Sequence, residues 1–333
     1  MILVTGGAGF IGSNLVAALT RRGSGRIVVC DRLCDAKRPN LRAAPQAEVI
    51  APEDLQDFLA GADLSRAGRL AAIFHMGAIS STTESDMDAL FEANVALSRM
   101  LWRVAAERSI PLIYASSAAT YGDGGLGFDD DGSIDGIARL RPLNPYGWSK
   151  QVFDLWVAWA LAGRNAAPPQ WAGLRFFNVY GPNEYHKKGQ QSVVPQVARQ
   201  AMAGQPARLF RSHRTDVPDG GQKRDFIWVG DCVDVMLWLY DNPGVSGLFN
   251  VGTGKARSFA DLAAAVFAAL GEPPRIDYVD TPAAIRARYQ YFTEARMQRL
   301  RTAGYDRPFT TLEDGVREYV ARHLATNDPY LAP

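Results

Sequence analysis

The first half of the chain alternates short apolar runs with longer stretches of helical periodicity. Short runs rich in β-branched residues are typical of buried strands, and apolar residues every three to four positions are typical of helices. Because strands that alternate with helices form βαβ units, the pattern indicates a parallel sheet. It predicts strands at Met1–Thr5, Ile27–Asp31, Ala71–His75, Leu112–Ser116 and Gly173–Asn178, and helices at Ser13–Arg22, Met87–Arg108 and Tyr146–Ala162.

The pattern becomes mixed after Asn178. It predicts short strands at Arg208–Phe210, Asp225–Val229, Leu248–Val251 and Arg275–Val279, and helices at Val193–Ala203 and Phe259–Leu270. We therefore expect an α/β fold: a Rossmann-like doubly wound parallel sheet with a smaller mixed α/β substrate domain toward the C-terminus. The expected division gives residues 1–178 to the dinucleotide-binding domain, with 225–252 returning to it. Residues 179–224 and 253–333 form the substrate-binding domain.

Composition narrows the class of protein. The chain has 333 residues, 47% hydrophobic and 21% charged, which is ordinary for a soluble globular enzyme. A net charge of +1 provides no overall field toward nucleic acid or membrane. Three scattered cysteines are too few for a disulfide framework or a metal cage, which fits a reducing compartment. The chain starts directly with an expected strand, and its apolar stretches are too short to span a bilayer, so we expect a cytoplasmic protein.

A glycine-rich turn follows the first expected strand. The segment GGAGFIG places Gly6, Gly9 and Gly12 at three-residue spacing between a strand and a helix. In dinucleotide-binding folds such glycines allow a tight turn, close approach of a pyrophosphate and close helix packing. The helix N-terminus then offers unpaired N–H groups to the phosphates. The turn predicts a dinucleotide site.

Residues at the end of the second strand bear on the choice of cofactor. Asp31 would accept a hydrogen bond from a ribose 2′-hydroxyl, which suits NAD. Arg32, Lys37 and Arg38 follow closely and can hold a 2′-phosphate. We expect NADP, with NAD as the alternative.

The segment NPYGWSK places Tyr146 and Lys150 four residues apart at the start of a helix. Asn144 is a good N-cap and Pro145 suits the first helical position. The spacing puts both side chains on one helix face, where an ammonium group, with a positive nicotinamide, can lower the pKa of a phenol. Ser117, in the segment YASSAATYG, ends a strand on the edge where such sheets bind ligands. These residues predict redox chemistry on an alcohol.

The segments GGAGFIG, SSAATYG and YGWSK together resemble the extended short-chain dehydrogenase/reductase superfamily. FHMGAISSTTE, FFNVYGPNEYHK, KRDFIWVGD and FNVGTG extend that resemblance over almost the whole chain. SSTTE (Ser80–Glu84), GPNEYHK (Gly181–Lys187) and RYQYFT (Arg288–Thr293) are most similar to the ADP-glycero-manno-heptose 6-epimerase family. Its members invert a carbinol of ADP-heptose in the synthesis of bacterial lipopolysaccharide, and the resemblance suggests a homo-oligomer, in that family a homopentamer.

The resemblance also assigns roles to residues. It implies that Tyr146 is a catalytic acid/base, that Lys150 lowers its pKa and binds the nicotinamide ribose, and that Ser117 binds the substrate hydroxyl. Further cofactor contacts would come from Phe10, Ile11, Asp31, Arg32, Lys37, Asn94, Val179 and Lys187. Substrate contacts would come from Asn178, Gln196, Phe210, Ser212, Arg224 and Tyr289. The chain departs from the family pattern at Pro52, Met76, Gly189 and Gln196 and in a longer loop around Val217–Gly221.

The segment NEYHKKGQQS, residues 183–192, has no helix or strand pattern but carries three basic residues. Inversion of an exocyclic carbinol by oxidation and re-reduction returns the hydride to the opposite face of a ketone. Because the keto group must turn, its oxygen occupies two places, and one fixed tyrosine serves both poorly. Lys187 is the expected second acid/base, a role that the resemblance also implies. His186 and Lys188 are expected to be structural or solvent-facing.

Three other readings remain. A nucleotide-sugar 4-epimerase of the UDP-galactose type would use the same cradle and Tyr–Lys pair, with less need of Lys187. A 4,6-dehydratase would carry an Asp–Glu pair where Ala118 and Ala119 follow Ser117. A non-catalytic dinucleotide sensor would be expected to have lost Tyr146 or Lys150.

Overall fold

The structure is a computed structural model that describes residues 1–61, 70–286 and 289–332. A seven-stranded parallel sheet has the order β11-β6-β5-β4-β1-β2-β3. Its strands are β1 (Ile2–Thr5), β2 (Ile27–Cys30), β3 (Glu48–Ile50), β4 (Ala72–His75), β5 (Leu112–Ser117), β6 (Trp171–Phe176) and β11 (Gly247–Val251). Strand order reverses at β1, which lies between β2 and β4, so the sheet is doubly wound as predicted.

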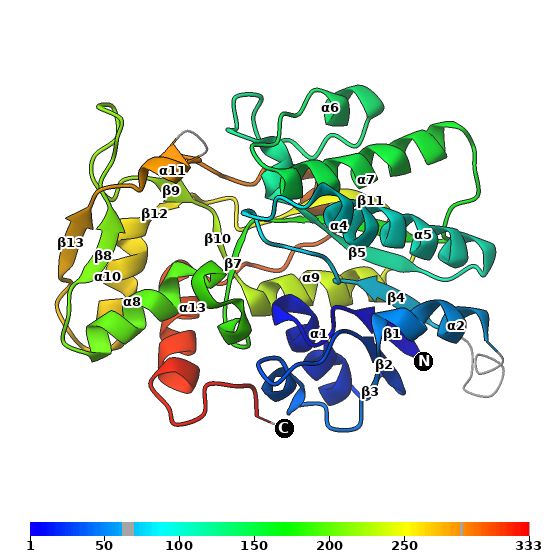
Figure 1. The fold of residues 1–333 in the computed structure, drawn as a ribbon, viewed down its shortest axis with the longest axis horizontal. Coiled ribbons are helices and arrows are strands. Elements are labelled where there is room, and N and C mark those ends of the chain that lie inside the picture. The colour runs from blue at the N-terminus through cyan, green and yellow to red at the C-terminus, as the bar shows by residue number, and fades with distance from the viewer. Residues whose placement is uncertain (62–69, 287–288, 333) are drawn as a thin grey trace.

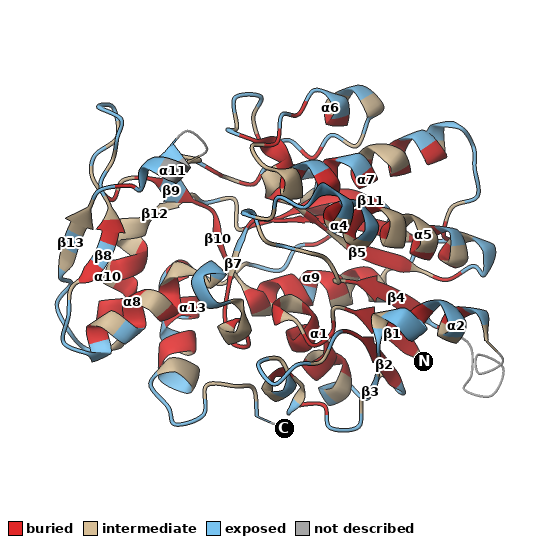
Figure 2. Ribbon diagram, viewed as in Figure 1, coloured by how far each residue is buried: buried red, intermediate tan, exposed pale blue. Residues whose placement is uncertain are grey.

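Helices cover both faces of this sheet (Figure 1). One face carries α1 (Phe10–Arg21) and α9 (Val229–Asp241); the other carries α2 (Leu55–Ala60), α4 (Met87–Leu90), α5 (Leu97–Glu107) and α7 (Pro145–Ala162). Consecutive strand residues Ile2, Leu3 and Val4 are therefore all fully buried. Figure 2 shows the buried strands between partly exposed helices. Burial on two faces explains why these strands read as continuous apolar runs.

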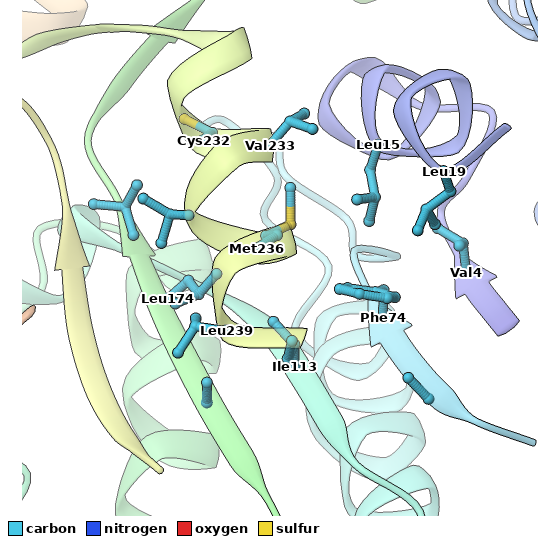
Figure 3. Packing of buried hydrophobic residues seen from close by; sticks show 14 of the residues in the cluster. Val4, Leu15, Leu19, Phe74, Ile113, Leu174, Cys232, Val233, Met236 and Leu239 are labelled. Carbon is cyan, nitrogen blue, oxygen red and sulfur yellow. The ribbon is translucent and has the colours of Figure 1, made fainter. Parts of the chain in front are cut away.

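The larger core lies between the sheet, α1 and α9 (Figure 3). Leu239 of α9 lies near the strand residues Ile113 and Leu174, Met236 points to the side where α1 lies, and Leu15 of α1 lies above Phe74. Because α9 follows β10 in the chain, the segment after residue 225 contributes to the main sheet layer.

A smaller region lies at the other end of the molecule from α2 and α5 (Figure 1). It packs α8 (Val193–Met202), α10 (Phe259–Ala269) and α13 (Leu312–Tyr319) beside the parallel pair β8 (Ala207–Phe210) and β13 (Ile276–Val279). Two small sheets lie between the regions: β7 (Asn178–Tyr180) with β10 (Phe226–Trp228), and β9 (Lys223–Arg224) with β12 (Arg257–Ser258). The other short helices are α6 (Ile134–Ala138), α11 (Ala283–Arg286), α12 (Gln298–Thr302), η1 (Arg38–Leu41), η2 (Pro52–Asp54), η4 (Ala118–Tyr121) and η6 (Val320–Leu324).

Several elements differ from the predictions. The polar edge strand β3 has no apolar run and escaped the pattern. The expected strand Gly173–Asn178 ends at Phe176, and the chain continues as β7 in a separate sheet. The helix expected at Met87–Arg108 contains a π-helical segment, η3 (Phe91–Ala96). The segment 183–192, which has no helix or strand pattern, contains a kinked 3₁₀ helix, η5 (Tyr185–Gln190). Within the described ranges no helix combines the length and apolarity needed to cross a membrane.

Candidate active site

The glycine turn joins β1 to α1 with very little space. Gly6 has a φ of +66°, and a Cβ there would lie 2.5 Å from the backbone N of Gly77. A Cβ on Gly12 would lie 2.1 Å from the carbonyl oxygen of Gly6, so Gly12 allows the helix to pack on its own turn, not on the strands. Apart from its chain neighbours, a Cβ on Gly9 would have, of the residues described, only the Gly6 carbonyl oxygen within 4 Å, at 3.1 Å. Gly9, the N-cap, thus leaves room for a ligand at the uncapped start of α1.

Both carboxylate oxygens of Asp31, at the end of β2, are engaged. The buried carboxylate accepts hydrogen bonds from the Ala8 N–H at 3.0 Å and from Lys37 Nζ at 2.7 Å. Lys37 therefore compensates the negative charge at the position where a dinucleotide ribose is expected. Arg32 instead forms an exposed ion pair with Glu53.

The start of α7 has the predicted capping. The Asn144 side chain accepts a hydrogen bond from the Gly147 N–H at 2.9 Å, and Pro145 is the first helical residue. This arrangement places Tyr146 in the first turn, where its phenol lies beside the Ser117 side chain at the end of β5, which lowers the pKa of the phenol. The structure thus brings together the two residues that the sequence separates by 29 positions.

The pKa of Tyr146 differs in direction from the expected one. Burial raises it above its usual value, while the hydrogen bond with Ser117 opposes this effect and the charge of Asp154 adds to it. Lys150 is not among the groups that shift the pKa of Tyr146, and its Nζ donates to the Ala115 carbonyl at 2.9 Å. Burial in turn lowers the pKa of Lys150 to about 8, with Asp154 acting in the opposite direction.

A buried charge network lies beneath the Tyr–Lys helix. Asp154, one turn beyond Lys150, accepts hydrogen bonds from Ser116 Oγ at 2.8 Å and from Arg175 Nε at 3.2 Å. Arg175 is fully buried and also donates to the Tyr121 hydroxyl at 3.1 Å. The sequence analysis missed this network. One sequence feature could have indicated Asp154: it continues the four-residue spacing of Tyr146 and Lys150 and so lies on the same helix face.

Asn94 lies within the π-helical segment η3 and is fully buried. Its amide donates to the Ile79 carbonyl at 3.0 Å and to Ser149 Oγ at 2.8 Å, and its oxygen accepts from the Ile79 N–H at 2.8 Å. Ser149 donates in turn to the Tyr146 carbonyl. Asn94 therefore fastens the loop after β4 to the Tyr–Lys helix.

Buried His75 supports the same region from β4. Its Nδ1 lies 2.6 Å from Thr5 Oγ1, and its Nε2 lies 2.8 Å from Ser98 Oγ. Burial, with a smaller effect of Lys150, lowers the pKa of His75 to about 3, so the ring is neutral at physiological pH.

Lys187 belongs to η5, and its side chain lies beside the start of α1. Its Nζ is 5.5 Å from the centroid of the Phe10 ring. Burial lowers its pKa, and Glu184 opposes that shift. Among the residues that the structure describes, none accepts a hydrogen bond from this Nζ. Lys188 next to it is exposed.

His186 is expected to be structural or solvent-facing. In the structure its ring is partly buried. Its Nδ1 lies 3.2 Å from the Asn40 amide nitrogen. Burial and the charges of Lys37 and Lys187 lower the pKa of His186 to about 4. The sequence analysis also missed Asn40, which donates to the Ala8 carbonyl at 2.9 Å and links η1 to the glycine turn.

Four of the six expected substrate residues gather between the sheet and the smaller region. Arg224 is buried and lies 5.5 Å from the Tyr289 ring centroid, and Phe210 packs edge-on to Tyr289 at 6.1 Å. Ser212 Oγ lies 3.2 Å from the hydroxyl of Tyr291, which also borders this cluster. Burial lowers the pKa of Arg224 to about 10 and raises that of Tyr289.

The remaining expected residues lie elsewhere around the site. Asn178 is exposed at the start of β7, with its side-chain oxygen 3.4 Å from Thr293 Oγ1. Gln196, on α8, donates to backbone carbonyls of its own helix start. Ile11 and Val179 pack against the main core. Arg288 lies outside the described residues.

The described part of the chain holds no group of three or more His, Cys, Asp or Glu side chains that could bind a metal ion. The glycine turn, by contrast, fits a dinucleotide, because Gly9 leaves space beside an uncapped helix start. The Ser117–Tyr146 pair ends on the same carboxyl edge of the sheet, so an alcohol held there would lie near the cofactor.

Comparisons with known proteins identify the family of the chain. The NAD dependent epimerase/dehydratase family matches residues 2–252. ADP-L-glycero-D-manno-heptose-6-epimerase of Nitratidesulfovibrio vulgaris (strain Hildenborough) is 50% identical over 332 residues, covering 99% of this chain and 100% of the relative.

Solved structures extend the likeness to three dimensions. Helicobacter pylori ADP-L-glycero-D-manno-heptose-6-epimerase is 28% identical with a TM-score of 0.75, covering 96% of this chain and 95% of the other. Thermus thermophilus UDP-glucose 4-epimerase in complex with NAD is 26% identical with a TM-score of 0.71, covering 95% and 96%. The family indicates a nicotinamide dinucleotide cofactor, for which the glycine turn has the expected geometry. The chain belongs to the NAD dependent epimerase/dehydratase family and, within it, to the ADP-L-glycero-D-manno-heptose-6-epimerases.

Proposed function

We propose that this protein converts ADP-D-glycero-D-manno-heptose to ADP-L-glycero-D-manno-heptose through a 6-keto intermediate, with Tyr146 and Lys187 as separate acid/bases. It is an isomerase that acts on a nucleotide sugar. One observation carries the site assignment: the Tyr146 phenol lies beside the Ser117 side chain at the sheet edge where the glycine turn also lies. This pair can hold an alcohol and remove its proton.

The two halves of the reaction place different demands on the protein. When bound, the dinucleotide supplies the hydride acceptor and donor. Ser117 orients the C6 hydroxyl, and Tyr146 holds or releases its proton. Inversion requires the pendant carbonyl to turn, so the returning proton must reach an oxygen in a different place. A second acid/base within hydrogen-bond reach of that place completes the reaction.

Lys187 is suited to this second role. Burial lowers its pKa toward the working range, and no described residue accepts a hydrogen bond from its Nζ, so the amine is available for a proton transfer. Its place over Phe10 puts it beside the first turn of α1, which begins at the glycine turn. A fixed tyrosine and a separate amine thus supply two proton carriers.

We assign the nucleotide part of the substrate to the cluster around Arg224. An arginine held against aromatic rings can bind a diphosphate while the rings pack on adenine. Arg224, Tyr289, Phe210 and Ser212 provide these groups. Asn178 and Gln196 lie at its margin as further candidates for polar contacts with the sugar.

The ion pair of Lys37 with Asp31 supports NADP as the preferred cofactor. A bare carboxylate would repel a 2′-phosphate, whereas a carboxylate at 2.7 Å from an ammonium group has its charge compensated. The test is the dissociation constant of each dinucleotide for the wild type and Lys37→Ala, measured by calorimetry. We expect the variant to lose affinity for NADP at least about tenfold more than for NAD, which corresponds to about 1.4 kcal/mol. An equal loss for both would favour NAD.

We further propose a cytoplasmic homo-oligomer, a homopentamer by family resemblance. The three free cysteines suit a reducing compartment. Trp148, Val152 and Trp159 expose a row of apolar side chains along α7, which suits a contact between copies. Light scattering of the purified protein tests the assembly, and a monomer at micromolar concentration would contradict it.

The substrate assignment is tested by incubating the purified protein with ADP-D-glycero-D-manno-heptose and following the C6 configuration by NMR. We expect an equilibrium mixture of the two C6 epimers. UDP-galactose is the matched control, because a 4-epimerase would act on it. Turnover of UDP-galactose without any change at C6 of the heptose would overturn the proposal.

A further inference from the structure

The Lys187 loop, residues 182–190, is fastened to the cofactor cradle on its inner side. Asn14 of α1 donates to the Pro182 carbonyl at 3.0 Å. Asn183, which is fully buried, donates to Ser13 Oγ at 3.0 Å and to the Asn40 carbonyl at 3.2 Å. These bonds fix the beginning of the loop to α1 and η1.

The C-terminal segment Asp328–Leu331 contacts the same loop from its outer side. The Tyr185 hydroxyl donates to the Pro329 carbonyl at 2.9 Å, and the Tyr330 ring packs edge-on against Tyr185 at 5.2 Å. The Leu331 N–H lies 3.4 Å from the side-chain oxygen of Asn183. The chain end thus covers the residues that directly precede His186 and Lys187.

The segment is itself attached to the dinucleotide side of the molecule. Arg42, directly after η1, lies 5.3 Å from the Tyr330 ring centroid and forms an ion pair with Asp328 at 2.6 Å. Both side chains of the ion pair are half exposed, so its contribution to stability is small. His323 Nδ1 lies 3.1 Å from the Pro329 carbonyl. The Tyr330 ring, between Tyr185 and Arg42, therefore joins the loop to the cradle.

The backbone of the loop needs such support. Asn183 has a φ of +71° and Lys188 a φ of +50°. Left-handed backbone in residues other than glycine costs of the order of 1–3 kcal/mol and persists only when surrounding contacts hold it. Glu184 holds one end, since its carboxylate accepts hydrogen bonds from Ser192 and from the Tyr319 hydroxyl. The C-terminal segment supplies contacts between these anchors, beside the residue that carries the amine.

We propose that Asp328–Leu331 is a positioning element of the active site, which holds the Lys187 loop against the cradle and thereby keeps Lys187 in place for proton transfer. The proposal rests on the acid/base role of Lys187 in the proposed function. None of the four residues is itself catalytic. They act through the ring contacts of Tyr330 and the hydrogen bonds made by Tyr185 and Asn183.

Limited trypsin digestion of the full-length protein reports on the loop without any substrate. Lys188 is exposed, so cleavage after Lys187 or Lys188 requires only local opening of the loop. We expect Tyr330→Ala to cleave about tenfold faster there than wild type, because cleavage follows the open population. Tyr330→Phe keeps both ring contacts and should cleave at the wild-type rate. Exposed Lys255, far along the chain, gives the internal control.

Steady-state kinetics separate positioning from general destabilisation. We expect Tyr330→Ala to lower kcat about tenfold with a smaller change in KM, and Tyr330→Phe to retain wild-type values. Truncation after Asn327 should reproduce Tyr330→Ala in both assays. Unchanged cleavage in Tyr330→Ala, or faster cleavage with an unchanged kcat, overturns the proposal. Failure of the proposed function has a separate signature, because the wild type would then not invert C6 at all.

Discussion

Tyr146 is buried in a place that favours its neutral form. Burial raises its pKa, the Ser117 hydroxyl lowers it, and the Lys150 ammonium is directed to a backbone carbonyl. The phenol is therefore protonated in the protein alone and suits the role of an acid. To act as a base it needs additional positive charge nearby, and the oxidised nicotinamide ring is the group that supplies this charge when bound.

Removal of either proposed proton carrier should affect catalysis strongly. We expect Tyr146→Phe and Lys187→Met each to lower kcat by about 10²–10⁴, the usual contribution of a positioned acid/base. Lys188→Met is the matched control, because Lys188 is the exposed neighbour of Lys187 and should keep wild-type activity. Epimerisation at the wild-type rate by Lys187→Met, with Tyr146→Phe inactive, would rule out the two-base mechanism.

The charge of Lys150 predicts an alkaline limit on activity. Burial lowers its pKa to about 8, so the ammonium group is present below this pH and lost above it. We expect kcat/KM to fall above about pH 8, and Lys150→Arg to shift that limb upward in whatever activity it retains. An unfolded lysine keeps its proton to about 10.5, so this group adds stability as pH rises between the two values. A flat kcat/KM profile to pH 10 would contradict the assignment.

At the scale of elements, β5, β6 and α7 meet at the Asp154–Arg175 ion pair. Both side chains are fully buried; Ser116 donates to Asp154 and Arg175 donates to the Tyr121 hydroxyl, while Arg175 Nη2 has no partner among the described residues. Loss of one partner would leave a charge without compensation in a medium of low dielectric constant. The pair therefore ties the Tyr–Lys helix to the strand that follows it in the sheet.

Asp154→Asn tests the contribution of this pair to stability. We expect a loss of about 3–5 kcal/mol in the free energy of unfolding, measured by urea denaturation. Asp241→Asn is the control, because Asp241 forms an exposed ion pair with Arg22 and should lose no more than about 1 kcal/mol. Equal effects of the two substitutions would show that burial does not decide the outcome.

The sequence predicted those elements whose patterns depend on local chemistry. Six of the seven sheet strands follow from apolar runs, and the Asn144 cap with Pro145 marks the start of α7 correctly. β3 escaped because an edge strand with exposed residues has no apolar run. The π-helical segment η3 escaped because its apolar spacing reads as an ordinary helix; within it Asn94 bonds to the distant Ile79.

The site residues likewise fall into two groups, those in local sequence motifs and those whose partners are distant in the chain. The glycine turn, Tyr146 and Lys150 belong to local motifs, so the sequence alone suggests them as one candidate group. The Arg175 partner of Asp154 and the Asn40 neighbour of His186 come from segments far apart in the chain, so no local pattern indicates them. Arg32 ion-pairs with Glu53 at the surface, and its contact with the cofactor stays a prediction.

At the scale of the whole molecule, the site lies where two regions of the chain meet. We propose the division into residues 1–178 with 225–252, and 179–224 with 253–333. The return of 225–252 to the first part is supported by α9 and β11, which pack in the main sheet layer. β7 and β10 pair with each other outside that sheet. Lys187 and the Arg224 cluster then come mainly from the smaller part, and Tyr146 and the cradle from the larger.

The most direct test of the central claim uses substrate with deuterium at C6. The protein is incubated with C6-deuterated ADP-D-glycero-D-manno-heptose in ordinary water, and the product is examined by NMR and mass spectrometry. Oxidation and re-reduction return the same hydride to the same carbon, so we predict inversion at C6 with the deuterium retained. No inversion, or inversion with loss of deuterium to solvent, would contradict the account.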